Sequence, residues 1–142
     1  MWRELFESIA KDTRDVYIQA PASRADIDLV ETSLGCLLPD ELVSLLLELN
    51  GDHDCLMSTN DIIETNLMLR EELTACMPLD CLLFFAQNGC GDYYGYGIRK
   101  NGDLDSSIFF WDHELDSREW YAVCLKDAIL RMYEMSDVVY TR

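Results

Sequence analysis

The sequence predicts an α+β fold, with a twisted antiparallel sheet packed by helices, and three observations carry that prediction. Helical patterns fill the first half of the 142 residues. The stretch from Leu79 to Glu114 then reads as three strands joined by two tight turns, and a last strand and helix follow. Hairpin-joined strands exclude a parallel doubly wound sheet, because parallel neighbours need long crossover connections.

The first two helices are predicted from spacing and from capping residues. Residues 2–10 place apolar side chains at helical spacing, and residues 16–18 are expected to be briefly extended. Ser23-Arg24-Ala25-Asp26 matches a capping box, in which the serine oxygen accepts an amide and the acid bonds back. Gly35 supplies the left-handed residue that ends this second helix.

The third helix has the clearest pattern in the chain. Pro39 suits its first turn, because the amide that proline lacks would have no partner there. Leucines recur at i, i+3, i+4 and i+7 from residue 42 to residue 49, which predicts a central core helix ending at Asn50-Gly51. Residues 56–58 suggest a short strand. Residues 59–73 are weakly helical, with these positions buried: Ile62, Ile63, Leu69 and Leu73.

The strand block follows Pro78. Residues 82–86 are apolar throughout, as expected for a strand covered on both faces. Asn88-Gly89 and Asn101-Gly102 are signals for tight turns. The remaining elements are expected at residues 108–111 and 119–123 as strands, at 125–133 as a helix, and from 136 as a frayed tail.

The middle strand alternates, which assigns its side chains to two faces. One face carries Tyr94, Tyr96 and Ile98, and the other carries Tyr93 followed by Gly95 and Gly97. The two glycines leave their face nearly bare. A helix or another chain is therefore expected to lie close against it.

The charge balance is strongly acidic. The chain has 27 acidic and 11 basic residues, a net charge of −16, and residues 39–80 carry ten acids with Arg70 as their one base. Such a field repels nucleic acid and anionic membranes and attracts basic partners. Negative charge also aids solubility in its own right, so that alternative stays open.

Length and segment composition predict one cytoplasmic domain spanning residues 1–142. The first residues lack the basic start and apolar run of a signal peptide, and no stretch approaches the ~20 apolar residues of a membrane span. The six cysteines form no Cys-x-x-Cys pair and have apolar neighbours. They are expected to be reduced and mostly buried.

The common catalytic and cofactor motifs fail on spacing, so no cofactor and no enzymatic activity are expected. Residues 89–95 lack the third glycine of a dinucleotide-binding loop, and a strand follows where its helix should start. Residues 103–114 have Ile108 at the position where a calcium loop requires glycine. No nucleophile elbow or Cys/His signature occurs.

Asp112-His113-Glu114 offers two carboxylates and an imidazole, which in principle suit acid–base chemistry or a metal. Neighbouring side chains on a strand point to opposite faces, so these three need a bend to converge. The other histidine is His53. A metal site joining His53 and His113 with Asp or Cys ligands is a minor alternative that the sequence leaves open.

Aromatic residues interleaved with acids suit a binding face for a basic partner. We expect Tyr93, Trp111 and Trp120 to be exposed there, beside these acids: Asp92, Asp112, Asp116 and Glu119. The competing interpretation is that the rings belong to the core.

Three motifs in order resemble the SUKH superfamily, whose members include Smi/Knr-type cell-wall regulators and bacterial immunity proteins. The first runs from Leu38-Pro39-Asp40-Glu41 into the helix that ends at Asn50-Gly51. The second is residues 82–94, LLFFAQNGCGDYY, and the third is Trp111-Asp112-His113-Glu114. The resemblance covers about residues 23–135, and only their combination is specific.

The resemblance implies a single α+β domain without catalytic residues. It also implies an immunity protein that neutralises a cognate toxin, for which the charge favours a basic, nuclease-type domain. A regulatory scaffold of the fungal Smi/Knr type is the alternative, and a homodimer through an unpaired sheet edge stays open. The expected partner-binding residues are Asp92, Tyr93, Tyr94, Trp111, Asp112, His113, Glu114 and Asp116.

Overall fold

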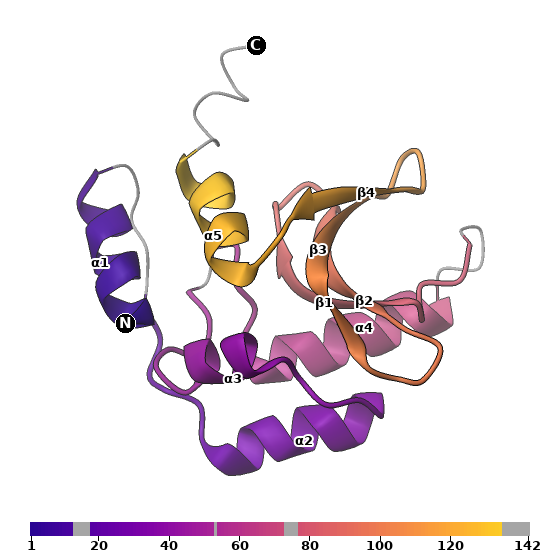
Figure 1. Cartoon of the computed structure of the whole chain (residues 1–142), viewed down its shortest axis with the longest axis horizontal. Coiled ribbons are helices and arrows are strands. Elements are labelled where there is room, and N and C mark those ends of the chain that lie inside the picture. The colour runs from indigo at the N-terminus through magenta and orange to yellow at the C-terminus, as the bar shows by residue number, and fades with distance from the viewer. Residues whose placement is uncertain (13–17, 53, 73–76, 135–142) are drawn as a thin grey trace.

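A computed structural model describes residues 1–12, 18–52, 54–72 and 77–134. Within these ranges four helices precede four strands, and a fifth helix follows, which confirms the α+β class (Figure 1). The helices are α1 (Trp2–Asp12), α2 (Arg24–Leu34), α3 (Asp40–Leu46), α4 (Thr59–Glu72) and α5 (Leu125–Glu134). The strands are β1 (Leu82–Gln87), β2 (Tyr93–Ile98), β3 (Leu104–Asp112) and β4 (Ser117–Ala122).

The four strands form one antiparallel sheet in the order β1-β2-β3-β4, so each strand pairs with its neighbour in sequence. The register shifts once in each pair. Such bulges bend the strands and increase their twist. Figure 1 shows the result, a strongly curved sheet with α1, α3 and α5 on one side and α4 beside β1. The twisted antiparallel sheet packed by helices is therefore confirmed.

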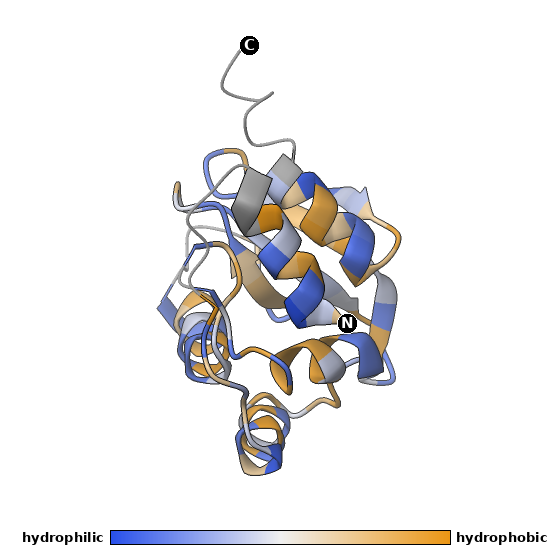
Figure 2. Ribbon diagram, turned by 90° about the vertical axis from the view of Figure 1, so that its left-hand side faces the viewer, coloured by the Kyte–Doolittle hydropathy of each residue, from blue (hydrophilic) through white to orange (hydrophobic). Residues whose placement is uncertain are grey.

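The larger core fills the space between the helices and one face of the sheet. The sheet contributes Leu83 and Phe85 from β1 and Tyr94 and Tyr96 from β2. Each of the five helices contributes at least one fully buried side chain, among them Phe6, Ile27, Leu45, Ile62 and Ile129. Figure 2 shows hydrophobic and hydrophilic residues interleaved along the helices. Removing these apolar faces from water stabilises the fold.

A smaller core lies on the opposite face of the sheet, where the sequence leaves the glycines bare. Its buried members are Leu69, Leu79, Leu82, Phe84 and Trp111. Both faces of β1 are thus covered, as predicted.

The atoms nearest to the two glycines belong to the neighbouring strands, and not to a helix or another chain as expected. A Cβ on Gly95 would lie 2.7 Å from the Leu83 carbonyl oxygen and 3.0 Å from the Phe84 ring. A Cβ on Gly97 would lie 3.2 Å from the Phe109 ring. The neighbouring strands therefore approach the glycines closely, and Leu69 of α4 belongs to the core on the same face of the sheet.

Capping residues set the bounds of α2 as predicted. The Ser23 hydroxyl accepts a bond from the Asp26 amide at 3.1 Å, and the Asp26 carboxylate accepts one from the Ser23 amide at 2.9 Å. Gly35 ends the helix with φ 71°. The next helix, α3, ends at Leu46, three residues earlier than the leucine pattern predicts. Leu49 is nevertheless fully buried, because the turn after α3 leads it into the core.

Glu41 joins three elements that are distant in sequence. Its Oε2 accepts a bond from the Tyr96 hydroxyl at 3.1 Å and one from the Leu125 amide at 2.6 Å. The second bond satisfies a backbone amide at the start of α5, where the helix dipole also favours negative charge. The Leu-Pro-Asp-Glu motif therefore has a structural role.

A buried carboxylate holds the loop after α3. Asp52 is fully buried, and its Oδ1 accepts bonds from the amides of Asp54, Cys55 and Leu56 at 2.9–3.1 Å. Its Oδ2 accepts a bond from the Tyr133 hydroxyl of α5. Burial raises the pKa of Asp52, although these bonds oppose the rise.

The outer edge of β1 is closed by the chain itself. The Met57 amide donates to the Phe85 carbonyl at 3.0 Å, and the Gln87 amide donates to the Cys55 carbonyl at 2.9 Å. The short strand predicted at residues 56–58 is thus confirmed only as a single bridge, between Leu56 and Ala86.

Some predicted features differ from the structure or lie outside it. Residues 16 and 17, Leu73 and the tail from residue 136 lie outside the described residues. β3 begins at Leu104, four residues before the expected start. Residues 88–92 form a longer turn between β1 and β2 than the tight hairpin predicted from Asn88-Gly89.

Candidate protein-binding surface

The expected binding residues come together at one end of the sheet, on the β1–β2 turn and the β3–β4 turn. Tyr93 at the start of β2 pairs with Trp111 near the end of β3, so the turns that adjoin these residues are neighbours. We call residues 88–92 and 112–116 the acidic turn surface. It contains four carboxylates and no Lys or Arg.

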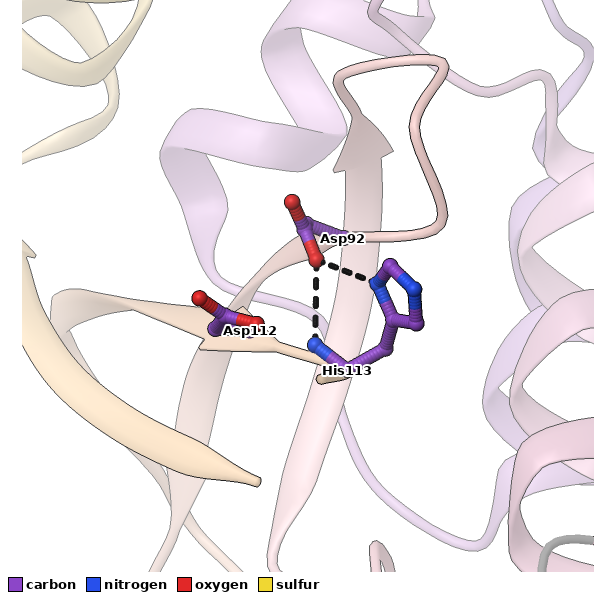
Figure 3. Close-up of side chains that lie close together, drawn as sticks. All are labelled: Asp92, Asp112 and His113. Atoms are coloured by element: carbon purple, nitrogen blue, oxygen red, sulfur yellow. Dashed lines mark hydrogen bonds and ion pairs between the residues drawn. The ribbon is translucent and has the colours of Figure 1, made fainter. Parts of the chain in front are cut away.

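Asp92 and His113 link the two turns directly (Figure 3). Asp92 Oδ1 accepts a bond from the His113 backbone amide at 3.0 Å and lies 2.7 Å from His113 Nδ1. The bond to Asp92 raises the pKa of His113. Asp92 is desolvated, but its bonds to His113 and Asn88 prevail and lower its pKa. Both groups are therefore charged in weakly acidic solution, and the short contact is a charge-assisted hydrogen bond.

Asn88 and Gly91 shape the β1–β2 turn around this pair. The Asn88 side-chain oxygen accepts the Cys90 amide at 2.9 Å, and its nitrogen donates to Asp92 Oδ2 at 2.9 Å. Gly91 has φ 92°, and a Cβ there would lie 3.0 Å from the His113 ring. Only glycine combines this backbone conformation with so close an imidazole.

Asp112 and Asp116 organise the β3–β4 turn. Asp112 Oδ1 accepts bonds from the amides of Glu114 at 2.9 Å and Leu115 at 3.3 Å. Asp116 Oδ1 accepts the indole N–H of Trp111 at 2.7 Å, and this bond lowers the pKa of Asp116. Glu114, in contrast, is exposed and makes no side-chain bond that the structure records. These roles divide the surface into positioning carboxylates and one outward-facing carboxylate.

The aromatic residues are less exposed than the sequence suggests. Trp111 is 1% exposed and belongs to the smaller core, so the expectation that its ring is exposed is wrong. Tyr94 is 9% exposed and belongs to the larger core. Tyr93 is half-buried, and Trp120 is 58% exposed as expected. A partner can therefore contact Tyr93 and Trp120, while Trp111 supports the surface through its bond to Asp116 and Tyr94 faces the larger core.

Asp92, Asp112 and His113 are also the group in the described chain whose oxygen and nitrogen atoms could approach a metal ion. Their candidate ligand atoms lie within 4.8 Å of one another. The bend that the sequence argument required exists, because β3 ends at Asp112, but Asp92 rather than Glu114 completes the group. The bond to Asp92 occupies the proton on His113 Nδ1 and accounts for the arrangement by itself. His53 lies outside the described residues.

The cysteines are not uniformly buried, which corrects the sequence-based expectation. Cys55 is buried and Cys36 and Cys124 are partly buried, but Cys81 and Cys90 are exposed. Exposure raises the access of oxidants to both thiols. Cys76 lies outside the described residues.

The sequence argument did not identify three residues that lie in or near this surface. Met77 and Leu115 are 68% and 77% exposed, and Arg118 donates bonds to the carbonyls of Met77 and Pro78 at 2.8 Å each. The available signal was Leu115, an apolar residue inside the charged segment 112–119. No local pattern places residue 77 beside Leu115, because the two lie 38 positions apart in the sequence.

None of the helices in the described ranges is long and apolar enough to cross a membrane. No curated protein matches the chain. The chain does match a protein family over residues 21–131, a range that includes α2 through β4 and most of α5. This match supports the assignment of an immunity-type or Smi1/Knr4-like domain, which acts on a protein partner. The chain belongs to the SMI1 / KNR4 family (SUKH-1).

Proposed function

We propose that this protein is a non-catalytic immunity protein, which binds a cognate toxin domain one to one in the cytoplasm and neutralises it. The observation that carries the proposal is the acidic turn surface, where four carboxylates from two turns gather at one end of the sheet. Family membership supports an immunity-type domain. The toxin is expected to be basic, of the nuclease type, and neither nucleic acid nor membrane is expected to bind.

The physical mechanism is electrostatic steering followed by occlusion. A nuclease needs a basic cleft to hold a phosphate backbone. An acidic protein is drawn toward such a cleft and reaches it faster than a neutral one would. Once seated, it excludes the substrate without any reaction of its own. The net charge of −16 supplies the long-range attraction, and the acidic turn surface supplies the local one.

Glu114 and Tyr93 are the groups that we expect to contact the toxin. Glu114 is exposed, and Tyr93 is half-buried beside Asp92. Asp92, Asp112, His113 and Asp116 bond to their own turns and would act mainly by their charge and by keeping the turns in place. Trp111 would act through its bond to Asp116, and Tyr94 by packing the start of β2 onto the larger core.

The test is co-expression of this protein with the product of each flanking gene. We expect one product to form an equimolar complex with it, and to kill cells only when this protein is absent. Glu114→Lys should weaken the complex by about tenfold or more, because it reverses a charge facing a basic surface. Asp28→Lys makes the same change at an exposed position of α2 and should leave the affinity within about twofold.

The absence of any complex and of any protection would contradict the proposal. The rival function is a regulatory scaffold of the Smi/Knr type, which the same family membership favours. In that case a signalling protein would bind, and no flanking product would be toxic. The co-expression series separates the two functions, because toxicity without this protein is expected only for an immunity pair.

A further inference from the structure

Three exposed apolar residues lie together at the edge of the acidic turn surface, one of them within its second turn. Met77 and Leu115 are 68% and 77% exposed, and Pro78 between Met77 and β1 is also exposed. The Met77 amide donates to Asp116 Oδ2 at 2.8 Å, which places residue 77 against the β3–β4 turn that carries Leu115. Figure 1 shows that turn and the segment before β1 both at the right-hand side. We call Met77, Pro78 and Leu115 the apolar tip.

The apolar tip is held in place from beneath. Asp116 accepts bonds from the Trp111 indole at 2.7 Å, the Met77 amide at 2.8 Å and Arg118 Nη2 at 3.1 Å. Arg118 also donates to the Pro78 carbonyl at 2.8 Å. Trp111 itself is anchored in the smaller core. These bonds hold the backbone of the tip, so little backbone entropy is lost when a partner binds.

The backbone of Asp116 adds a second sign that this turn is specialised. Its φ is 53°, the one positive value among the non-glycine residues that the structure describes. Residues held in such conformations persist where surrounding bonds determine them, and they concentrate at binding and catalytic sites. The three bonds to the Asp116 carboxylate are what hold it. Through its bond to the Met77 amide, Asp116 fixes the backbone of residue 77 beside the turn that carries Leu115.

The charges around the apolar tip indicate what kind of surface covers it. Residues 77–81 and 112–120 contain five carboxylates, and their one Lys or Arg is Arg118, whose guanidinium bonds to Asp116 and to the carbonyls beneath the tip. An apolar centre with a charged surround is the usual arrangement of a protein interface. A second copy of this chain, with net charge −16, would meet the same acids. A basic surface with an apolar depression complements them.

We propose that the apolar tip is the energetic centre of the toxin interface, and that Met77 and Leu115 insert into an apolar depression surrounded by basic residues on the toxin. This inference rests on the proposed function and deepens it. The carboxylates then govern the rate of association, while the apolar tip governs how long the complex lasts.

The test compares two double variants of unchanged charge in binding to the toxin domain that the co-expression series identifies. M77S/L115S replaces the two large side chains of the apolar tip. L29S/L37S removes two leucines that are 58% and 75% exposed on and just after α2. M77S/L115S should weaken binding by about 100-fold, as expected for two interface hot spots, mainly through faster dissociation. L29S/L37S should bind within about twofold of wild type. Unchanged thermal unfolding of both variants shows that they fold.

The outcomes separate the inference from the proposed function. If wild-type protein binds and Glu114→Lys weakens the complex while M77S/L115S does not, the inference is wrong and the proposed function stands. If wild-type protein binds no flanking product, both are wrong. If light scattering shows a wild-type dimer that M77S/L115S converts to a monomer, a second copy covers the tip, and the assignment to a toxin is overturned.

Discussion

Asp92 and His113 show how single residues shape the proposed interface. One carboxylate oxygen holds both the backbone and the ring of His113, and the turns of two hairpins are thereby joined. The pKa values of Asp92 and His113 shift in opposite directions. The pKa of His113 is raised, so its stabilising contribution is complete below about pH 6.5 and is lost as pH rises through its folded pKa. The pKa of Asp92 is lowered, so its contribution is complete above about pH 3.9 and is lost as pH falls through its folded pKa.

We therefore expect the pKa of His113, followed by NMR titration of its ring, to lie above about 6.5. The largest cause of the rise is the bond to Asp92, and the charge of Glu114 contributes less. Asp92→Asn should lower the pKa of His113 more than Glu114→Gln does. An equal effect of the two variants would mean that the general negative field, and not the bond, raises the pKa.

At the scale of elements, the two edges of the sheet are treated differently. The β1 edge is closed by residues 55–57 and by side chains of α4. The β4 edge carries Arg118 and Glu119, and the Arg131 side chain of α5 donates to the Tyr121 carbonyl. Charges, short length and a register shift discourage strand addition at an edge. The fold therefore does not favour a homodimer through either edge.

Asn66 of α4 is the side chain on which the β1 edge depends most. It is fully buried, its nitrogen donates to the Phe84 carbonyl at 2.8 Å, and its oxygen accepts the Phe84 amide at 2.8 Å. Asn66→Ala leaves both backbone groups without these partners. We expect the free energy of unfolding to fall by about 2–4 kcal/mol in urea titrations.

Asn60→Ala is the matched control for this change. Asn60 lies on the same helix but is exposed, and its side chain bonds to Glu64 at 3.3 Å. Its loss should cost under about 0.5 kcal/mol. Similar losses for the two variants would show that the bonds to β1 contribute little, since helix propensity alone favours alanine over asparagine at both positions.

The elements that could be predicted from the sequence are those with local causes. The capping box and Gly35 set the bounds of α2, and both signals lie within four residues of the helix they bound. The end of α3 was missed, because Leu49 keeps the leucine pattern while its backbone has left the helix. Leu49 fits the core whether or not the helix continues to it, so the leucine periodicity alone does not show where α3 ends.

The candidate site was predictable in composition but not in geometry. Its acids were visible as a run at residues 112–116. The convergence of Asp92 with His113 depends on how β2 registers with β3, which is a long-range property. Trp111 was expected outside because it adjoins acids, but its side of the sheet has a core of its own. The apolar tip joins residues 77 and 115, and no sequence pattern relates them.

At the scale of the whole molecule, charge is the dominant property. The proposed function requires the negative field to act at a distance, so the rate of association with the toxin should depend on salt. Stopped-flow measurements should show this rate falling by about tenfold or more from 0.02 to 0.5 M NaCl, where screening is strong. Dissociation should change much less. A rate of association that does not change with salt would show that electrostatic attraction plays no part in the mechanism.

The central claim is that this protein works by covering a basic partner with its acidic turn surface and apolar tip. Hydrogen exchange of the purified complex tests it most directly. The account predicts slowed exchange on binding in the described segments 77–81, 88–92 and 112–116, with no change along the exposed face of α2. Protection confined to α2 and α3, with those segments exchanging as in the free protein, would contradict it.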